Sequence, residues 1–150
     1  MTTRYPEGPA TSPGFLLWHV TLAWQRAVTA VLDPLGLTHV QFVLLASAWW
    51  LGSHGQVPNQ LGLARHAGTD VKMTSQVLRR LEAKGLLERA VDPGDTRARR
   101  LRLTPAGRRL ARRAVAAVEE ADAHFFGPEA GAATALLQRL IGQATPPASG

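Results

Sequence analysis

The sequence contains no cysteine. This absence excludes disulfide bonds, zinc–thiolate sites and thiol-based redox sensing. Catalytic patterns are missing as well, because there is no G-x-S-x-G motif, no phosphate-binding loop and no carboxylate pair with a suitable partner. The histidines are scattered without the spacing of metal ligands: His19, His39, His54, His66 and His124. We therefore expect no enzyme activity, no metal site and no cofactor.

Long, clean hydrophobic runs are also lacking. The most apolar stretch, residues 15–32, is interrupted by His19, Gln25 and Arg26, whereas a membrane span should be cleaner. The first residues, MTTRYPEGPATSPG, do not follow the charged-then-apolar order of a signal peptide. These absences predict a cytoplasmic chain that does not contact a membrane.

Acidic residues are in the minority, with 11 Asp or Glu against 17 Lys or Arg and a net charge of +6. The positive charge is concentrated. Residues 70–113 hold thirteen Lys or Arg and five Asp or Glu, while the rest of the chain holds four basic and six acidic residues. A basic block in an otherwise slightly acidic molecule favours a binding face for an anionic partner.

The length and composition indicate one domain with terminal extensions. The chain has 150 residues, 45% of them hydrophobic, which is enough for a real core. Residues 1–12 and 144–150 are rich in Pro, Gly, Thr and Ser and are predicted to be flexible. We expect a single domain over residues 13–143.

Start and stop signals divide this domain into helices. Ser12 followed by Pro13 begins a first helix, and Pro34 ends it. Gly127 with Pro128 ends the longest helix and separates it from a last short one. The other helix starts are marked by capping residues, namely the Thr38 and Gln41 capping box, Asp70 or Thr69, and Thr104 before Pro105.

One β-hairpin interrupts the helices. Residues 86–92, LLERAVD, and residues 96–104, TRARRLRLT, read as two strands. The sequence DPGD between them places Pro and Gly at the centre of a turn. The predicted fold is therefore mainly α-helical with a small β-hairpin.

The helix over residues 71–84 separates two kinds of side chain. A short helix and a turn containing Gly68 precede it, which gives the proportions of a helix-turn-helix. One side of the helix faces a core: Val71, Thr74, Val77, Leu78 and Leu81. The other side collects residue types that suit base edges and phosphates, whereas an ordinary surface helix mixes Glu with Lys: Lys72, Ser75, Gln76, Arg79, Arg80 and Ala83.

The second strand of the hairpin carries the densest positive charge. Leu101 and Leu103 share one face and are expected to pack on the helices. The arginines lie on the other face or nearer the tip, where they can reach a phosphate backbone: Arg97, Arg99, Arg100 and Arg102. Asp95 either orients the Arg97 guanidinium by a charge-assisted hydrogen bond or serves as a turn acid.

The stretch GTDVKMTSQVLRRLEAKGLLERAVDPGDTRARRLRLTPAG resembles the MarR family of winged helix-turn-helix transcription regulators. The matching features are LRRLEAKGLLER at the end of the recognition helix, the DPGDTR wing, and LRLTPAG leading into the next helix. The resemblance covers roughly residues 15–141. It implies a winged helix-turn-helix over about residues 37–104, flanked by dimerisation helices over about residues 13–33 and 105–143.

The resemblance also implies a function. A protein of this kind is a homodimer whose first and last two helices interleave, and it binds a pseudo-palindromic site in double-stranded DNA. Most members are repressors, and some are released from DNA by a small ligand. The D-x-R of the family's wing falls on Asp95 and Arg97, with Arg97 as the minor-groove residue. The remaining expected DNA contacts are Lys72, Thr74, Ser75, Gln76, Arg79, Arg80, Arg99 and Arg100.

Two alternatives remain open from the residues alone. The tryptophans on the first two helices either pack in the core or line a pocket for an aromatic or other hydrophobic effector, where the expected lining is Trp18, His19, His39 and Trp49. The arginines either bind DNA or meet an acidic partner protein, in which case the winged helix is a protein-interaction module.

Overall fold

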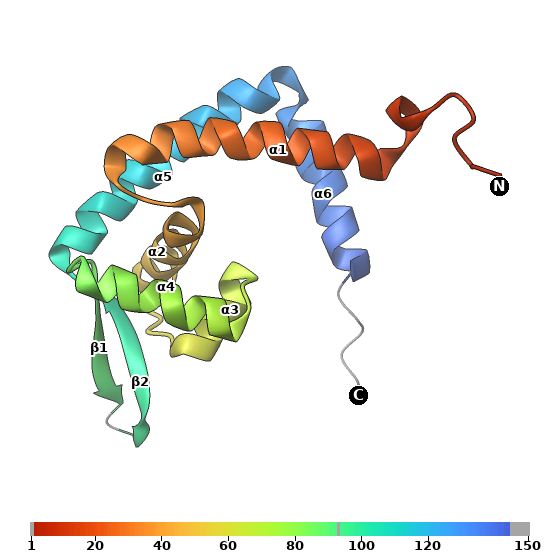
Figure 1. Ribbon diagram of the computed structural model, residues 1–150. Coiled ribbons are helices and arrows are strands. Elements are labelled where there is room, and N and C mark those ends of the chain that lie inside the picture. The colour runs from red at the N-terminus through yellow and green to blue at the C-terminus, as the bar shows by residue number, and fades with distance from the viewer. Residues whose placement is uncertain (1, 93, 145–150) are drawn as a thin grey trace.

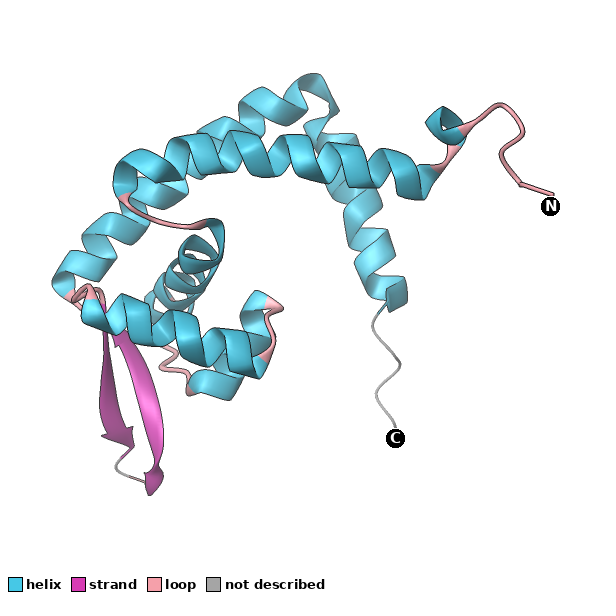
Figure 2. Ribbon diagram, in the orientation of Figure 1, coloured by secondary structure: helices cyan, strands magenta, loops and turns pink. Residues whose placement is uncertain are grey.

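The structure is a computed structural model that describes residues 2–92 and 94–144, with the side chains of Asp92 and of residues 95–98 outside the description. It is mainly helical with one two-stranded antiparallel sheet, which confirms the predicted fold class (Figures 1 and 2). The elements are η1 (Pro9–Thr11), α1 (Pro13–Leu32), η2 (Asp33–Leu35), α2 (His39–Ser53), α3 (Gln60–Ala67), α4 (Val71–Ala83), β1 (Leu87–Asp92), β2 (Asp95–Leu103), α5 (Pro105–Phe126), η3 (Gly127–Glu129) and α6 (Ala130–Ala144).

The helices begin where their capping residues predict. Ser12 Oγ accepts from the backbone N–H of the first turn of α1, and Thr38 and its partner three residues on form both bonds of a capping box before α2. Of the two candidates before α4, Asp70 is the cap, because its Oδ1 accepts from Met73 N at 2.8 Å. Thr104 Oγ1 accepts from the backbone N–H of the first turn of α5 at 3.0 Å. Each cap satisfies a backbone N–H that has no partner within its helix.

The β-hairpin is fixed at its root and projects from the body at its tip. Leu87 pairs with Leu103, and Arg89 pairs with Leu101. The three leucines are buried, and Leu101 N also donates to Pro58 O of the loop before α3 at 2.9 Å. Beyond this root the strands extend away from the helices (Figure 1). The hairpin is therefore attached to the body along one end only.

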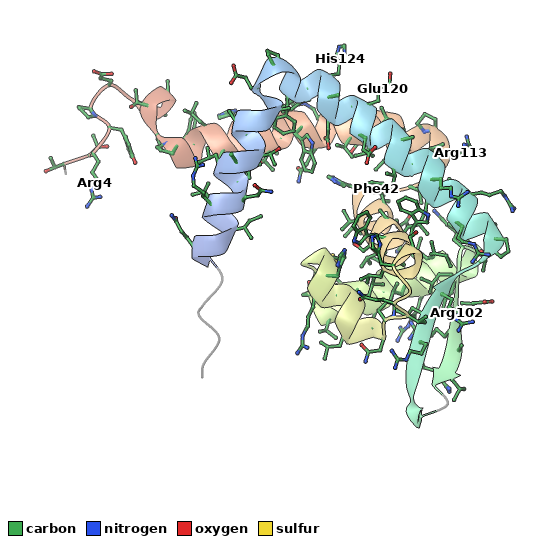
Figure 3. All side chains as sticks on the ribbon, turned by 180° about the vertical axis from the view of Figure 1, so that it is seen from behind. Arg4, Phe42, Arg102, Arg113, Glu120 and His124 are labelled. Atoms are coloured by element: carbon green, nitrogen blue, oxygen red, sulfur yellow. The ribbon has the colours of Figure 1, made fainter. Side chains whose placement is uncertain are left out.

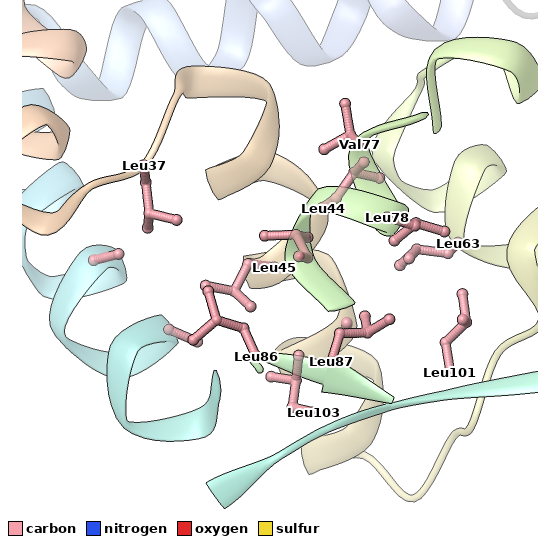
Figure 4. Close-up of a cluster of buried hydrophobic side chains, with 14 of the residues drawn as sticks. Leu37, Leu44, Leu45, Leu63, Val77, Leu78, Leu86, Leu87, Leu101 and Leu103 are labelled. Carbon is pink, nitrogen blue, oxygen red and sulfur yellow. The ribbon is translucent and has the colours of Figure 1, made fainter. Parts of the chain in front are cut away.

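One hydrophobic core joins the sheet to the helices α1 to α5 (Figure 4). Burying a leucine side chain contributes about 1.5–3 kcal/mol, so this cluster supplies much of the stability of the region. The part of the core around the sheet is made of leucines from α2, α3, α4 and the two strands: Leu44, Leu45, Leu63, Leu78, Leu81, Leu87, Leu101 and Leu103. Because α4 and the root of the hairpin share this core, their relative orientation is set by it.

The long helices α1 and α5 pack along each other, and α6 extends from the far end of α5 (Figure 1). The C-terminal half of α1 buries Val28 and Leu32. Its N-terminal half and α6 leave large apolar side chains exposed, among them Leu17, Trp18 and Leu137. By length and composition alone the helical stretch Pro13–Leu35 also meets the criterion for a membrane span, which is weak evidence because an apolar packing helix passes the same test.

We predict that Gly107→Ala will destabilise the protein. An added Cβ at this position, in the first turn of α5, would lie 1.9 Å from Leu86 O, so α5 would have to move away from the root of the hairpin. We expect the free energy of unfolding to fall by about 3 kcal/mol or more. Urea unfolding followed by circular dichroism measures the change.

The matched control is Gly52→Ala, since a Cβ on this glycine of α2 meets no described atom within 4 Å. This variant should be neutral, or more stable by up to about 1 kcal/mol through helix propensity. Equal midpoints for the two variants would show that α5 does not close on Leu86 as described.

Candidate nucleic-acid interface

Helices α3 and α4 form a helix-turn-helix. Helix α3 buries Leu63 and Ala64 against the core and ends at Gly68, whose φ is 72°. This left-handed conformation costs glycine little, and it reverses the chain sharply enough for Asp70 to cap α4 two residues later. The turn therefore sets the angle at which α4 leaves α3 and crosses the molecule.

Helix α4 has one buried and one exposed side, as predicted. The buried residues are Thr74, Val77, Leu78 and Leu81. Val71 is a correction: it was expected on the core side but is 54% exposed, because it lies in the first turn, beyond the edge of the core. On the outer side Ser75 is half-buried, and the following residues are exposed: Lys72, Gln76, Arg79, Arg80 and Ala83.

Thr74 is a second correction, because its expected DNA contact conflicts with its position. The side chain is fully buried. Its hydroxyl donates to Asp70 O at 2.7 Å and lies 2.6 Å from Thr69 Oγ1. A hydroxyl held in this way braces the first turn of α4 and presents no atom to a ligand outside.

Two further charged residues at the C-terminal end of α4, Glu82 and Lys84, contact other elements. Glu82, the acid on its outer middle turns, forms an ion pair with Arg89 of β1. Lys84 follows the helix, and its Nζ donates to Gly36 O at 2.6 Å and to Gln41 Oε1 at 3.0 Å. Sequence reasoning missed both contacts. They hold the end of α4 to the start of α2 and to the hairpin, and they leave the outer side of α4 with a net positive charge.

The arginines of the hairpin differ in their environment. Arg99 is exposed near the tip. Arg100 is half-buried, and its Nη1 donates to Val57 O at 2.6 Å, so it ties β2 to the loop before α3. Asp95 and Arg97 lie in β2, and their side chains are outside the described part of the structure. Glu82 and Arg89 form the one ion pair found among the described residues. Within that part of the chain the following side chains therefore have no carboxylate partner: Lys72, Arg79, Arg80 and Arg99.

The four expected effector-lining residues are not brought together. Trp18 is 63% exposed on α1, where His19 packs edge-on against Phe15. Trp49 lines a cavity on another part of the molecule, beside the root of the hairpin. That cavity is not lined by Trp18, His19 or His39, so a single pocket formed by the four residues stays a prediction.

His39 belongs instead to a polar cluster where α1, α2 and α5 meet. Its ring lies edge-on to Trp24, with 5.0 Å between centroids, and Trp24 Nε1 donates to Asp122 Oδ1 at 2.7 Å. Burial lowers the pKa of His39, and the nearby Asp122 carboxylate opposes part of that shift. Sequence reasoning missed the hydrogen bond between Trp24 and Asp122. Within the described ranges no group of three or more His, Cys, Asp or Glu is placed to hold a metal ion.

Comparison with known proteins agrees with this geometry. The MarR family model matches residues 37–98. The HTH-type transcriptional regulator YdcH of Bacillus subtilis is 46% identical over 120 residues, which are 80% of this chain and 82% of YdcH. The HTH-type transcriptional repressor Rv2887 of Mycobacterium tuberculosis is 38% identical over 113 residues, 75% of this chain and 78% of the repressor.

Solved structures give the same result. CouR from Rhodococcus jostii, crystallised with p-coumaroyl-CoA, superposes with a TM-score of 0.82 at 29% identity, over 96% of this chain and 99% of CouR. Rv2887 in complex with DNA superposes with a TM-score of 0.66 at 32% identity, over 87% of this chain and 98% of that one.

The helix-turn-helix and the adjoining hairpin define a winged helix-turn-helix protein of the DNA-binding class. The chain belongs to the MarR family. It is a DNA-binding transcriptional regulator, and the regulators of this family are not enzymes.

We predict that Thr74→Val and Gln76→Ala will separate the two sides of α4. Thr74→Val removes a buried hydroxyl and should lower the free energy of unfolding by about 1–2 kcal/mol, while the folded protein keeps its preference among DNA sequences. Gln76→Ala removes an exposed amide and should cost about 1–3 kcal/mol at one base position if the amide reads a base edge.

The measurement is binding to a set of duplexes that differ by single base pairs. A uniform loss for Gln76→Ala would assign Gln76 to a phosphate. Lost discrimination at one base pair for Thr74→Val would contradict the buried position of that side chain.

Proposed function

We propose that the protein is a homodimeric repressor that binds a pseudo-palindromic DNA site through α4 and the wing. The observation that supports this most strongly is the cationic outer side of α4, which lies beside the arginine-rich hairpin. The buried side of α4 and the root of that hairpin belong to one core. The relative Rv2887 is named as a repressor, and its crystal structure in complex with DNA is similar to the structure of this chain.

In this proposal α4 enters the major groove, and the wing follows the adjacent backbone and minor groove. The amide of Gln76 and the guanidinium groups of Arg79 and Arg80 suit base edges and phosphates. The full set of proposed contacts omits Thr74 and comprises Lys72, Ser75, Gln76, Arg79, Arg80, Asp95, Arg97, Arg99 and Arg100. The guanidinium of Arg100 donates to Val57 O of the loop before α3, so Arg100 extends less far toward DNA than Arg99 in this proposal.

The exposed apolar side chains of α1 and α6, and the groove that these helices form with α5, support dimerisation through residues 13–33 and 105–143, around a winged helix-turn-helix of residues 37–104. A groove of about 610 Å³ between these helices is lined by Leu17, Val20, Phe126, Leu136 and Leu137. A second copy of the chain that fills this groove would remove the surface from water, at about 25 cal/mol per Å² buried. For such a dimer to bind a pseudo-palindromic site, its two α4 helices must lie about one turn of DNA apart.

We further propose that a small ligand weakens DNA binding and that the protein acts in the cytoplasm, where its DNA lies. The similar protein CouR is bound to p-coumaroyl-CoA in its crystal structure. A ligand that binds better to a different spacing of the two α4 helices shifts the population toward that spacing by its difference in affinity. The four residues expected to line the ligand pocket, Trp18, His19, His39 and Trp49, do not line one cavity, so they do not indicate where the ligand binds.

The test of the proposal is a salt series for binding to duplex DNA, with Arg97→Ala as the variant. We expect log affinity to fall linearly with log salt, with a slope of about 0.9 for each phosphate neutralised. Arg97→Ala should weaken binding to most sequences and reduce the slope by about one. Arg113→Ala, which removes the same charge from the exposed side of α5 (Figure 3), is the control and should leave the slope unchanged.

A response that is flat in salt would overturn the proposal and favour a module that binds an acidic partner protein. Unchanged affinity of Arg97→Ala at physiological salt would remove the wing from the mechanism.

A further inference from the structure

The first turn of α4 carries two large apolar side chains that lie outside the core. Val71 is 54% exposed and Met73 is 40% exposed. This turn lies beside α3, at the end of α4 that is farther from the wing (Figure 1). Hydrophobic stabilisation depends on the apolar area removed from water, so side chains this exposed contribute little to folding. Their position is therefore not explained by the packing of the core.

Hydrogen bonds hold the turn from which these side chains project. Asp70 Oδ1 accepts from Met73 N at 2.8 Å, and Asp70 O accepts from Thr74 Oγ1 at 2.7 Å. The buried Thr74 hydroxyl also lies 2.6 Å from Thr69 Oγ1. The backbone at Val71 and Met73 is therefore fixed in the free protein, which lowers the entropy that a contact through these residues would lose.

The neighbours of the two apolar side chains suit DNA. Lys72 lies between them in the sequence and is exposed. Gln76, also exposed, is three residues after Met73 and four after Lys72, so it lies beside both on the helix surface. The first turn contains no acid after the Asp70 cap, although acids are favourable at a helix N-terminus. The surface thus combines a cation, an amide and apolar groups without a carboxylate that would repel phosphates.

Thymine is the base that matches such a surface. In the major groove the edges of the bases present hydrogen-bond donors and acceptors, and thymine adds a methyl group at C5. The N-terminal residues of a recognition helix are those that reach the base edges. An apolar side chain placed against the methyl group removes both from water, which favours thymine over a base without that group.

We propose that Val71 and Met73 contact the 5-methyl groups of thymines and so give α4 a preference for thymine at those positions. This contact requires the proposed function, because α4 must enter the major groove. It goes beyond that function by naming the base, the chemical group and two residues that composition alone does not associate with DNA binding.

The test removes single methyl groups from the DNA. In a duplex that the protein selects from its native genome, each thymine is replaced in turn by uracil, which keeps the base pair and its O4 acceptor. Binding of the full chain is measured by fluorescence anisotropy at one salt concentration. We expect about fourfold weaker binding at one or more positions, which is the effect of losing one buried methyl group.

Variants assign each sensitive position to a side chain. Val71→Ser and Met73→Ala remove the apolar groups, so each should bind the thymine and uracil duplexes equally well at the position that its residue contacts. Val71→Ile and Met73→Leu keep an apolar side chain, and each should retain the difference between the two duplexes. Because both residues are exposed, the variants should fold, and circular dichroism of the free protein checks this.

Two results would overturn the inference. The first is equal affinity of the unaltered protein for the thymine duplex and every uracil duplex. The second is a difference between the duplexes that persists in both Val71→Ser and Met73→Ala, which would assign the methyl contact to another side chain. Steep salt dependence together with either result would remove this contact and leave the proposed function intact, whereas a protein that does not bind DNA would remove both.

Discussion

The burial of one side of α4 is the constraint on which the rest of the structure depends. Val77, Leu78 and Leu81 enter the same core as the leucines at the root of the wing, and a helix that buries one side must turn the opposite side outward. The exposed amide and guanidinium groups of α4 therefore have a fixed direction relative to the wing. The same packing that stabilises the protein also fixes the direction of its proposed DNA-binding surface.

Polar contacts lock this arrangement at its edges. Lys84 joins the end of α4 to the capping box of α2, Arg89 pairs with Glu82, and Leu101 bonds to the loop before α3. Gly107 allows α5 to approach the backbone of Leu86 without a Cβ between them. Through this approach the start of α5, one of the helices of the proposed dimer, is held against the root of the wing.

The interactions that the sequence predicted well are local. The Ser12, Thr38 and Thr104 caps depend on residues three positions away, and the strand alternation around Leu101 depends on residues two positions away, so spacing alone reveals them. Two of the missed interactions span long separations, 48 residues between Lys84 and Gly36 and 98 between Trp24 and Asp122, and the third joins Glu82 and Arg89, which are seven residues apart but lie on different elements. Only packing brings such residues together. The scattering of the residues expected to line one pocket has the same cause.

In the proposed homodimer two α4 helices, each with one side in the core and the cationic side outward, read one DNA site at the pitch of the duplex. Hydroxyl-radical footprinting on a fragment selected by the protein from its native genome tests it most directly. We expect two protected patches related by a two-fold axis, with centres about 10–10.5 base pairs apart or a multiple of that spacing. A single protected patch, or binding with no discrete protection, would contradict it.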